Sequence, residues 1–282
     1  MAFELGAARP DSSADYVHGL ARAVSHDWSN VETLKCIELG PDDVHMWRAR
    51  LDVGSAVLRG LARTLAPNEI ERTSQFRFLL HRNLFVAARG ILRHILSGYM
   101  QTAPQALLLR STAKGKLFLA DKCGVHFNVS HSGTLALYAV ARHEVGIDIE
   151  RIDARLATPD VAMRVFTSRE LAEWYALPAS ERSRVFFDCW TRKEAYLKGR
   201  AEGLSLPLSE LEVWSAGGEF RVLFSDGQMW ALRSLKPTGE YSAAVAVEGG
   251  RASVKCLDFW LSDGVRANSG VAPELKQTAI PG

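Results

Sequence analysis

The sequence contains few cysteines, and none is placed to form a common type of zinc site. Cys36, Cys123, Cys189 and Cys256 lie far apart in the 282-residue chain and form no CxxC or Cys/His pattern. Structural zinc sites usually take their ligands from closely spaced pairs of these residues. The cysteines therefore give no support to a zinc protein, and a reducing compartment is expected.

Long apolar runs are also missing. No segment approaches the roughly 18 uninterrupted apolar residues that are needed to cross a bilayer. The first residues include Glu4, Asp11 and Asp15, whereas a secretory signal needs a basic region followed by an apolar one. We therefore expect a cytoplasmic protein that does not enter a membrane.

The chain lacks a strong excess of either charge. It has 34 Lys and Arg residues against 32 Asp and Glu residues, a formal net charge of +2. A dedicated nucleic-acid binder is normally far more basic, so we expect no nucleic-acid partner, whereas anionic small ligands stay open. The G-x-S-x-G turn of serine hydrolases and the G-x-x-x-x-G-K-[ST] loop of P-loop proteins are absent as well.

Periodic patterns in the first third of the chain predict one strand and two helices. Alternation from Val44 predicts a short strand, and residues 51–65 predict a helix that ends before Pro67. Apolar residues recur every three or four positions over residues 69–99, which predicts one long amphipathic helix. Its other face carries a row of arginines: Arg72, Arg77, Arg82, Arg89 and Arg93. This row either meets an anionic ligand or is a solvated helix face, and spacing does not decide.

The rest of the chain mixes strands with one further helix. Period-two alternation predicts strands over residues 125–130, 135–141 and 145–150. Helical spacing returns over 182–198. Further short strands are predicted over 205–214, 220–224, 229–235 and 241–247. Residues 1–40 are weakly patterned and are expected to be a variable segment, and 262–282 lack periodicity and are expected to be a flexible tail.

Three acidic residues stand out as candidate ligands. Asp148 and Glu150 lie at i and i+2 on a predicted strand, so both project from one face, roughly 7 Å apart, close enough to share one hard cation. Glu194 interrupts the apolar stripe of the helix over 182–198, where an ionised carboxylate needs a partner. The alternatives are a solvated strand face for the first two and an i+4 pair with Lys198 for Glu194.

Oxygen ligands without nearby Cys or paired His residues point to Mg²⁺, which commonly keeps water and substrate phosphates in its coordination shell. The substrate is therefore expected to contain phosphate. Ser130 and His131, in a strand that runs into a Ser132-Gly133 turn, offer a hydroxyl, an imidazole and turn amides suited to phosphate oxygens. A capped hairpin explains these residues about as well.

Three motifs occur in one order along the chain. They are Asn128-Val129-Ser130-His131-Ser132, Gly146-Ile147-Asp148-Ile149-Glu150, and Trp190-Thr191-Arg192-Lys193-Glu194-Ala195-Tyr196-Leu197-Lys198. Together they resemble the Sfp-type 4′-phosphopantetheinyl transferase family, whose signatures are N-[IVL]-S-H-S, G-[IV]-D-[IVL]-E and W-[ST]-x-K-E-[AS]-x-x-K. Further similarity lies at Trp47, at 86–89 and at 203–207, so the resemblance covers residues 44–247.

The resemblance implies an α+β fold of two similar, pseudo-symmetric halves, expected over residues 41–144 and 145–261, with the active site and coenzyme A between them. It implies a monomeric enzyme that transfers 4′-phosphopantetheine from coenzyme A to a serine of an apo acyl or peptidyl carrier protein. Holo-carrier and adenosine 3′,5′-bisphosphate are the products. Two other functions stay open: a magnesium-dependent hydrolase of nucleotide diphosphates, and a non-enzymatic coenzyme A binding module.

Individual site residues also follow from the resemblance. Asp148, Glu150 and Glu194 match magnesium ligands of the family, and Glu194 also matches the proposed base for the carrier serine. Lys198 matches a lysine that contacts the diphosphate and assists the leaving group, which makes Asp148, Glu194 and Lys198 the expected catalytic residues. The expected coenzyme A contacts are Arg72, Arg82, Lys116, Ser130, His131 and Lys198. Leu117 replaces the family's usual proline, and Glu69 stands where some members have lysine.

Overall fold

The structure is a computed structural model, and it describes residues 28–30, 37–121, 123–201, 207–213, 219–223, 227–249 and 252–259. The predicted tail and most of the predicted variable segment lie outside these residues. The 203–207 motif does as well, apart from Pro207. None of the described helices is long and apolar enough to cross a membrane.

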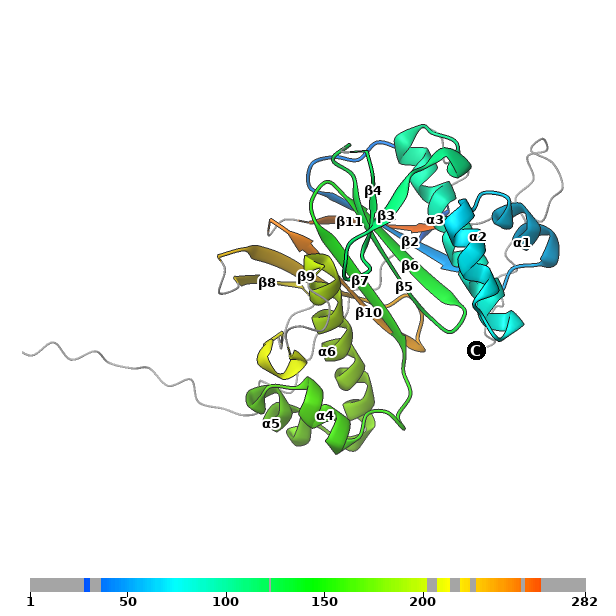
Figure 1. The fold of residues 1–282 in the computed structure, drawn as a ribbon. Helices are drawn as coiled ribbons and strands as arrows, with labels where there is room; N and C mark the ends of the chain where they lie inside the picture. The colour runs from blue at the N-terminus through cyan, green and yellow to red at the C-terminus, as the bar shows by residue number, and fades with distance from the viewer. Residues whose placement is uncertain are drawn as a thin grey trace, which may run out of the picture.

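Two sheets form the centre of the molecule (Figure 1). The first has the order β1-β11-β2-β6-β5, and the second has the order β7-β10-β9-β8. The strands of the first sheet are β1 (Ser29–Asn30), β2 (Asp43–Arg50), β5 (His126–Ser132), β6 (Leu135–Ala141) and β11 (Ser253–Asp258). Those of the second are β7 (Val145–Arg151), β8 (Glu219–Leu223), β9 (Met229–Leu235) and β10 (Tyr241–Glu248). A separate hairpin pairs β3 (Leu109–Ser111) with β4 (Leu117–Leu119).

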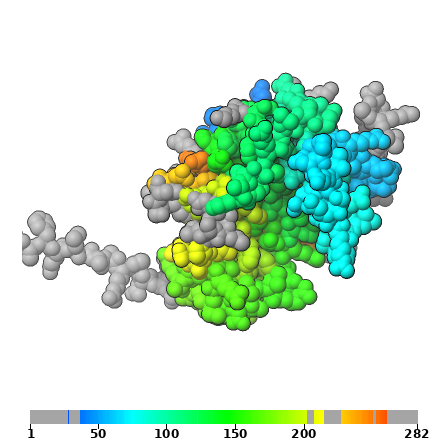
Figure 2. Space-filling model, viewed as in Figure 1, coloured from blue at the N-terminus to red at the C-terminus, as the bar shows by residue number. Residues whose placement is uncertain are grey.

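Each sheet is accompanied by three helices. The first half has α1 (Ser55–Ala62), α2 (Pro67–Ser74) and α3 (Leu79–Met100), and the second has α4 (Pro159–Val165), α5 (Ser168–Ala176) and α6 (Ala179–Arg200). In both halves one strand precedes three helices, and the half ends in an antiparallel hairpin, β5–β6 or β9–β10, that follows β3 and β4 in the first half and β8 in the second. The first strand of each half pairs antiparallel with the last strand of that hairpin. The expected α+β fold of two similar halves is confirmed. In the space-filling view, α2 and α3 (cyan) and α4–α6 (yellow-green) lie on opposite sides of the visible face (Figure 2).

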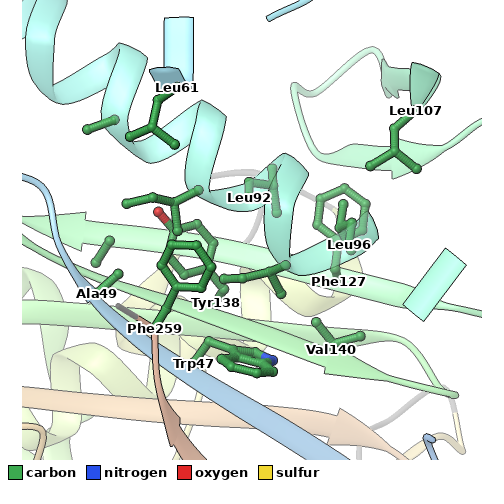
Figure 3. Packing of buried hydrophobic residues seen from close by; sticks show 14 of the residues in the cluster. Trp47, Ala49, Leu61, Leu92, Leu96, Leu107, Phe127, Tyr138, Val140 and Phe259 are labelled. Carbon is green, nitrogen blue, oxygen red and sulfur yellow. The ribbon is translucent and has the colours of Figure 1, made fainter. Parts of the chain in front are cut away.

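The apolar residues of these elements form three buried layers. Trp47, Phe127 and Tyr138 pack beneath α3 (Figure 3). A second cluster, which includes Met46 and Ile147, fills the space between the two sheets, and a third lies beneath α6. The alternation predicted for residues 135–141 places Tyr138 under α3 and its neighbours between the sheets, so this strand is buried on both faces. The order of layers is therefore helix, sheet, sheet, helix.

The prediction of a single helix over residues 69–99 is wrong. The chain leaves helical geometry between α2 and α3, where Phe78 has extended backbone angles. The reason is tertiary: α2 folds back so that the buried carboxylate of Glu69 accepts a hydrogen bond from Arg93 Nε on α3 at 2.7 Å. In one straight helix these residues would be about 36 Å apart, at about 1.5 Å per residue.

The strand predicted over 205–214 is also wrong in its described part. Residues Leu208–Glu210 form a 3₁₀ turn, and its neighbours do not join a sheet. Their backbone groups bond to side chains of the second half instead: Lys193 Nζ donates to the Leu208 carbonyl at 2.9 Å, and the Val213 amide donates to Glu170 at 2.8 Å. The helix predicted over 51–65 is present in a shorter form as α1, whereas α4, α5 and β11 were not predicted.

Candidate active site

A glycine lets strand β7 and helix α6 approach each other closely. A Cβ atom on Gly146 would lie 1.9 Å from the carbonyl oxygen of Ala195 and 2.2 Å from the amide nitrogen of Gly199. No side chain fits at these distances, so only glycine permits the contact. Because residues at i+2 and i+4 share a strand face, the acidic pair of β7 faces the last turns of α6.

Asp148 is the buried centre of the site. The residue is only 1% exposed. Its Oδ1 accepts hydrogen bonds from Lys198 Nζ at 2.5 Å and from Ser130 Oγ at 2.9 Å. Its Oδ2 is buried and has no hydrogen-bond partner among the described residues. A buried carboxylate oxygen without a partner is costly, and a bound cation would satisfy it.

The other two acids respond to the charge of Asp148. Burial, together with that charge, raises the pKa of Glu150, although the Ser132 hydroxyl donates to its carboxylate at 2.9 Å. Burial and the same charge raise the pKa of Glu194. The structure therefore brings the three predicted carboxylates within electrostatic reach of one another, and it pairs Lys198 with Asp148, an arrangement that the i+4 alternative did not anticipate.

The chemistry of these donors fits a hard divalent cation that shares its coordination with water and ligand oxygens. The observation that supports the fit is the partnerless Oδ2 of Asp148 beside two carboxylates whose pKa values are raised. Within the described part of the chain, no group of three or more His, Cys, Asp or Glu side chains forms a site that could hold a metal ion. Oxygen atoms from outside the protein would have to complete the coordination.

Strand β5 fixes the acidic strand through alternate side chains. Asn128 Oδ1 accepts from the Ile147 amide at 2.9 Å, Ser130 donates to Asp148, and Ser132 Oγ accepts from the amide of Arg151 at 3.1 Å. The hydroxyl expected to hold phosphate thus holds an acid in this structure. The roles of residues 128 and 132 were missed from the sequence, and the period-two spacing of N-x-S-H-S is the signal that could have revealed them.

A cavity of about 1000 Å³ opens beside the acids. Its walls come from α2, α3, the β3–β4 hairpin and β5 on one side and from the end of α6 on the other. The lining contains these basic side chains: Arg72, Arg89, Arg110, Lys114, Lys116 and Lys198. Apolar side chains such as Phe85, Leu92 and Phe127 also line it. This combination suits a ligand that carries phosphates on an otherwise less polar body.

The cavity contains some of the predicted ligand residues and not others. Its lining includes Arg72, Lys116, His131, Glu194 and Lys198. Arg82 is exposed and is not part of the lining, while Ser130, Asp148 and Glu150 do not line it either. Arg110 and Lys114 were not predicted, although their position around the Gly115 turn is a usable signal.

His131 lies at the rim of the cavity. Its side chain is exposed, yet nearby protein atoms remove enough water to lower the pKa of the imidazole, and the positive charge of Lys198 lowers that pKa further. The ring is therefore neutral at pH 7, where it offers one donor and one acceptor nitrogen.

The predicted row of arginines does not form one surface. Arg93 is 1% exposed and is bonded to Glu69 and to the carbonyls of Pro104 and Leu107. Arg89 lies beside the same carboxylate, 3.4 Å from it, and lines the cavity. Neither of the two alternatives for this row describes Arg93, which is a buried structural residue.

Two family models match adjoining parts of the chain. The model described as 4′-phosphopantetheinyl transferase superfamily matches residues 144–246, and the one described as 4′-phosphopantetheinyl transferase, N-terminal matches residues 53–143. The two matches meet where the first half of the fold ends and β7 begins.

Curated proteins with names of this kind are similar to the chain. The 4′-phosphopantetheinyl transferase HetI of Nostoc sp. is 39% identical over 212 residues, which is 74% of this chain and 89% of that protein. The 4′-phosphopantetheinyl transferase Sfp of Bacillus subtilis is 27% identical over 149 residues, 53% of this chain and 66% of Sfp. The L-aminoadipate-semialdehyde dehydrogenase-phosphopantetheinyl transferase of Xenopus laevis is 28% identical over 211 residues, 66% of this chain and 69% of that protein.

Proposed function

Because this chain belongs to the 4′-phosphopantetheinyl transferase superfamily, we propose that it moves 4′-phosphopantetheine from coenzyme A to a serine of an apo acyl or peptidyl carrier protein. The serine oxygen forms a bond to the β-phosphorus of the diphosphate, and the bond from that phosphorus to the bridging oxygen breaks. The products are holo-carrier and adenosine 3′,5′-bisphosphate. The observation that carries the proposal is a basic cavity whose wall includes Glu194 and Lys198, the first coupled electrostatically to Asp148 and the second bonded to it.

The basic side chains of the cavity are proposed to bind the phosphates of coenzyme A. Arg72, Lys116 and His131 line one wall, and Lys198 lines the other. Phosphoryl transfer depends mainly on positioning and on the stabilisation of charge on phosphate oxygens. Arg72, Lys116 and Lys198 supply positive charge, whereas the neutral ring of His131 can supply a hydrogen bond. The predicted contact with Arg82 stays a proposal, with less support because that residue lies outside the lining.

Asp148, Glu150 and Glu194 are proposed to hold Mg²⁺. Such an ion, when bound, supplies charge that stabilises the phosphate oxygens during transfer. Lys198 is proposed to contact the diphosphate and to give a proton to the bridging oxygen as it leaves. In this structure its ammonium lies between Asp148 and Ser130, at the junction of the acids and the cavity.

Glu194 is proposed to take the proton from the serine hydroxyl. It lines the cavity, and its pKa is raised by burial and by Asp148, which brings it closer to the working pH of the enzyme. A general base works best when its pKa is near that pH. Removal of a general base costs about 10²- to 10⁴-fold in rate.

We propose that the protein acts as a monomer, which light scattering of the purified protein would test. The thiols of Cys123, Cys189 and Cys256 are free in the structure, which supports a reducing compartment such as the cytoplasm.

The direct test is mass spectrometry of several purified apo-carriers after incubation with coenzyme A and Mg²⁺. We expect a phosphopantetheine adduct on serine that appears with the wild type and is lost with a chelator. Consumption of coenzyme A at the same rate without a carrier would instead indicate a diphosphate hydrolase. Binding of coenzyme A without turnover in any reaction would indicate a binding module.

A further inference from the structure

Lys116 connects the two walls of the cavity. Its Nζ donates to the carboxylate of Glu144 at 2.6 Å and to the carbonyl of Gly199, at the end of α6, at 2.5 Å. The lysine itself belongs to the turn between β3 and β4, and its side chain is 10% exposed. Glu144 directly precedes β7. We call this set of contacts the Lys116 strap.

Physical causes account for both ends of the Lys116 strap, the β3–β4 turn and the end of α6. The β3–β4 turn is closed by the Thr112 amide, which donates to the Lys116 carbonyl at 2.8 Å, and by Gly115, whose φ of +88° suits glycine. The last carbonyls of a helix lack partners within it and carry partial negative charge, so the end of α6 attracts an ammonium group. The β3–β4 turn is thereby held against the end of the helix that carries Glu194 and Lys198.

Glu144 is itself held in place. Its second carboxylate oxygen lies 3.0 Å from His126 Nδ1 on β5. Burial alone would raise the pKa of Glu144, but the hydrogen bonds from His126 and Lys116 and their charges lower it to about 2. The carboxylate is thus ionised at neutral pH and provides a fixed negative partner for the nearly buried ammonium.

We propose that Glu144 is a positioning residue that acts through Lys116. By holding the ammonium between the hairpin and the end of α6, it fixes the separation of the cavity walls and presents the lysine to a phosphate-bearing ligand at little further cost in conformational entropy. The proposal rests on the proposed function, since it takes coenzyme A as that ligand. Glu144 does not line the cavity, so its influence on binding passes through Lys116.

The test compares Glu144→Gln, Lys116→Met and the double variant. Glu144→Gln keeps the shape of the side chain and removes its charge, and we expect KM for coenzyme A to rise about 3- to 10-fold, with kcat within about twofold of wild type. Lys116→Met is expected to raise KM at least as much. The double variant should match Lys116→Met alone, because a residue that acts through another has no effect once that other residue is gone.

Two further measurements separate positioning from a general loss of stability. Amide hydrogen exchange across residues 109–119 should become faster in Glu144→Gln while exchange in the core of α3 is unchanged. Glu240→Gln is the matched control, since its pair with Arg151 is exposed on both sides, and it should change neither KM nor exchange in the hairpin. If Glu144→Gln fails to fold, Glu144→Asp keeps the charge and shortens the reach, and a smaller rise in KM is expected.

Unchanged KM and unchanged hairpin exchange in Glu144→Gln would overturn the proposal, as would additive effects in the double variant. Calorimetric titration with coenzyme A measures the effect of the Lys116 strap on binding affinity without any need for turnover. A wild type that binds coenzyme A but modifies no carrier would therefore refute the transferase function and still allow the strap to be judged.

Discussion

The long helices α3 and α6 occupy equivalent places, each as the third helix of its half. Both have 22 residues, and both end at a residue with left-handed backbone angles. The fifteenth residue of each is a buried cation, Arg93 in α3 and Lys193 in α6. Each cation pairs with a glutamate, Glu69 or Glu170, that also accepts a hydrogen bond from the backbone amide at the N-cap of the helix before.

The two helices differ at the next position. Residue 94 is a histidine whose ring lies against Phe259, whereas residue 194 is the glutamate of the acidic cluster. Four positions later α3 has a glycine and α6 has Lys198. The halves therefore share one scaffold, and the proposed catalytic residues Asp148, Glu194 and Lys198 all lie in the second half. Stability and chemistry should be separable by changing equivalent positions.

The largest effect is expected at the buried centre of the acidic cluster. Asp148→Ala removes the carboxylate that pairs with Lys198 and that would bind the metal, so transfer should fall further than the loss of a base alone, which is about 10²- to 10⁴-fold. Rates of carrier modification across a range of Mg²⁺ concentrations measure it. Metal-supported transfer that survives in this variant would contradict the assignment.

The second prediction compares the sixteenth residue of each long helix, Glu194 in α6 and His94 in α3. Glu194→Gln should lower the transfer rate about 10²- to 10⁴-fold. Its melting temperature should stay equal to or above that of the wild type at pH 7 without metal, because the substitution removes a charge that is crowded by Asp148. His94→Gln is the matched control and should leave the rate within a few-fold. Equal losses of transfer rate in Glu194→Gln and His94→Gln would contradict the proposal that only the second half carries the catalytic glutamate.

The buried ion pairs should both contribute to stability. Lys193→Met leaves Glu170 buried without its cation and should lower the free energy of unfolding by about 3–5 kcal/mol. Arg93→Met should cost at most that much, because Arg89 still lies 3.4 Å from Glu69. Arg169→Gln removes two pairs of an exposed arginine, with Glu173 and Glu212, and should cost no more than about 1 kcal/mol. Urea denaturation gives all three values. A small effect of Lys193→Met, no larger than that of Arg169→Gln, would contradict the prediction.

Gly146 and Gly60 differ in the space around them. Gly146→Ala must push β7 away from α6, and overpacking of this kind typically costs about 1–3 kcal/mol, with loss of activity because the acids move. Gly60→Ala lies in α1 with open space around it and should be neutral or stabilising by up to about 1 kcal/mol. Thermal unfolding and activity assays of the two variants would show whether steric contact or helix propensity governs each site.

The smallest effect concerns acid pH. The pKa of Glu144 in the folded protein is about 2, below its ordinary value of 4.5. A lowered carboxyl pKa stabilises the fold above the unfolded pKa, and this contribution is lost as the pH falls from 4.5 toward 2. The stability of Glu144→Gln should therefore depend less on pH in that window. Identical slopes for both proteins would show that the Lys116 strap adds no stability.

Local pattern in the sequence was enough to predict several of the regular elements. Alternation located β2, β5, β6 and β7, and helical spacing located α6, because the side chains on one face of each element recur along the chain with a fixed period. The acidic cluster could be predicted for the same reason: a strand pair at i and i+2 and a glutamate on an apolar stripe depend only on position along the chain. Membership of the family also follows from residues that lie in three short motifs.

Contacts between side chains that are distant in the sequence could not be predicted from local pattern. Helix α2 folds back on α3, where Glu69 accepts a hydrogen bond from Arg93. Lys198 bonds to Asp148 because Gly146 lets β7 approach α6 closely. Ser130 holds an acid, and Lys116 reaches across the cavity to Glu144. The partners in these contacts are 18 to 50 residues apart in the sequence. Local periodicity carries no information about such distances, because they are set by how the sheets and helices pack.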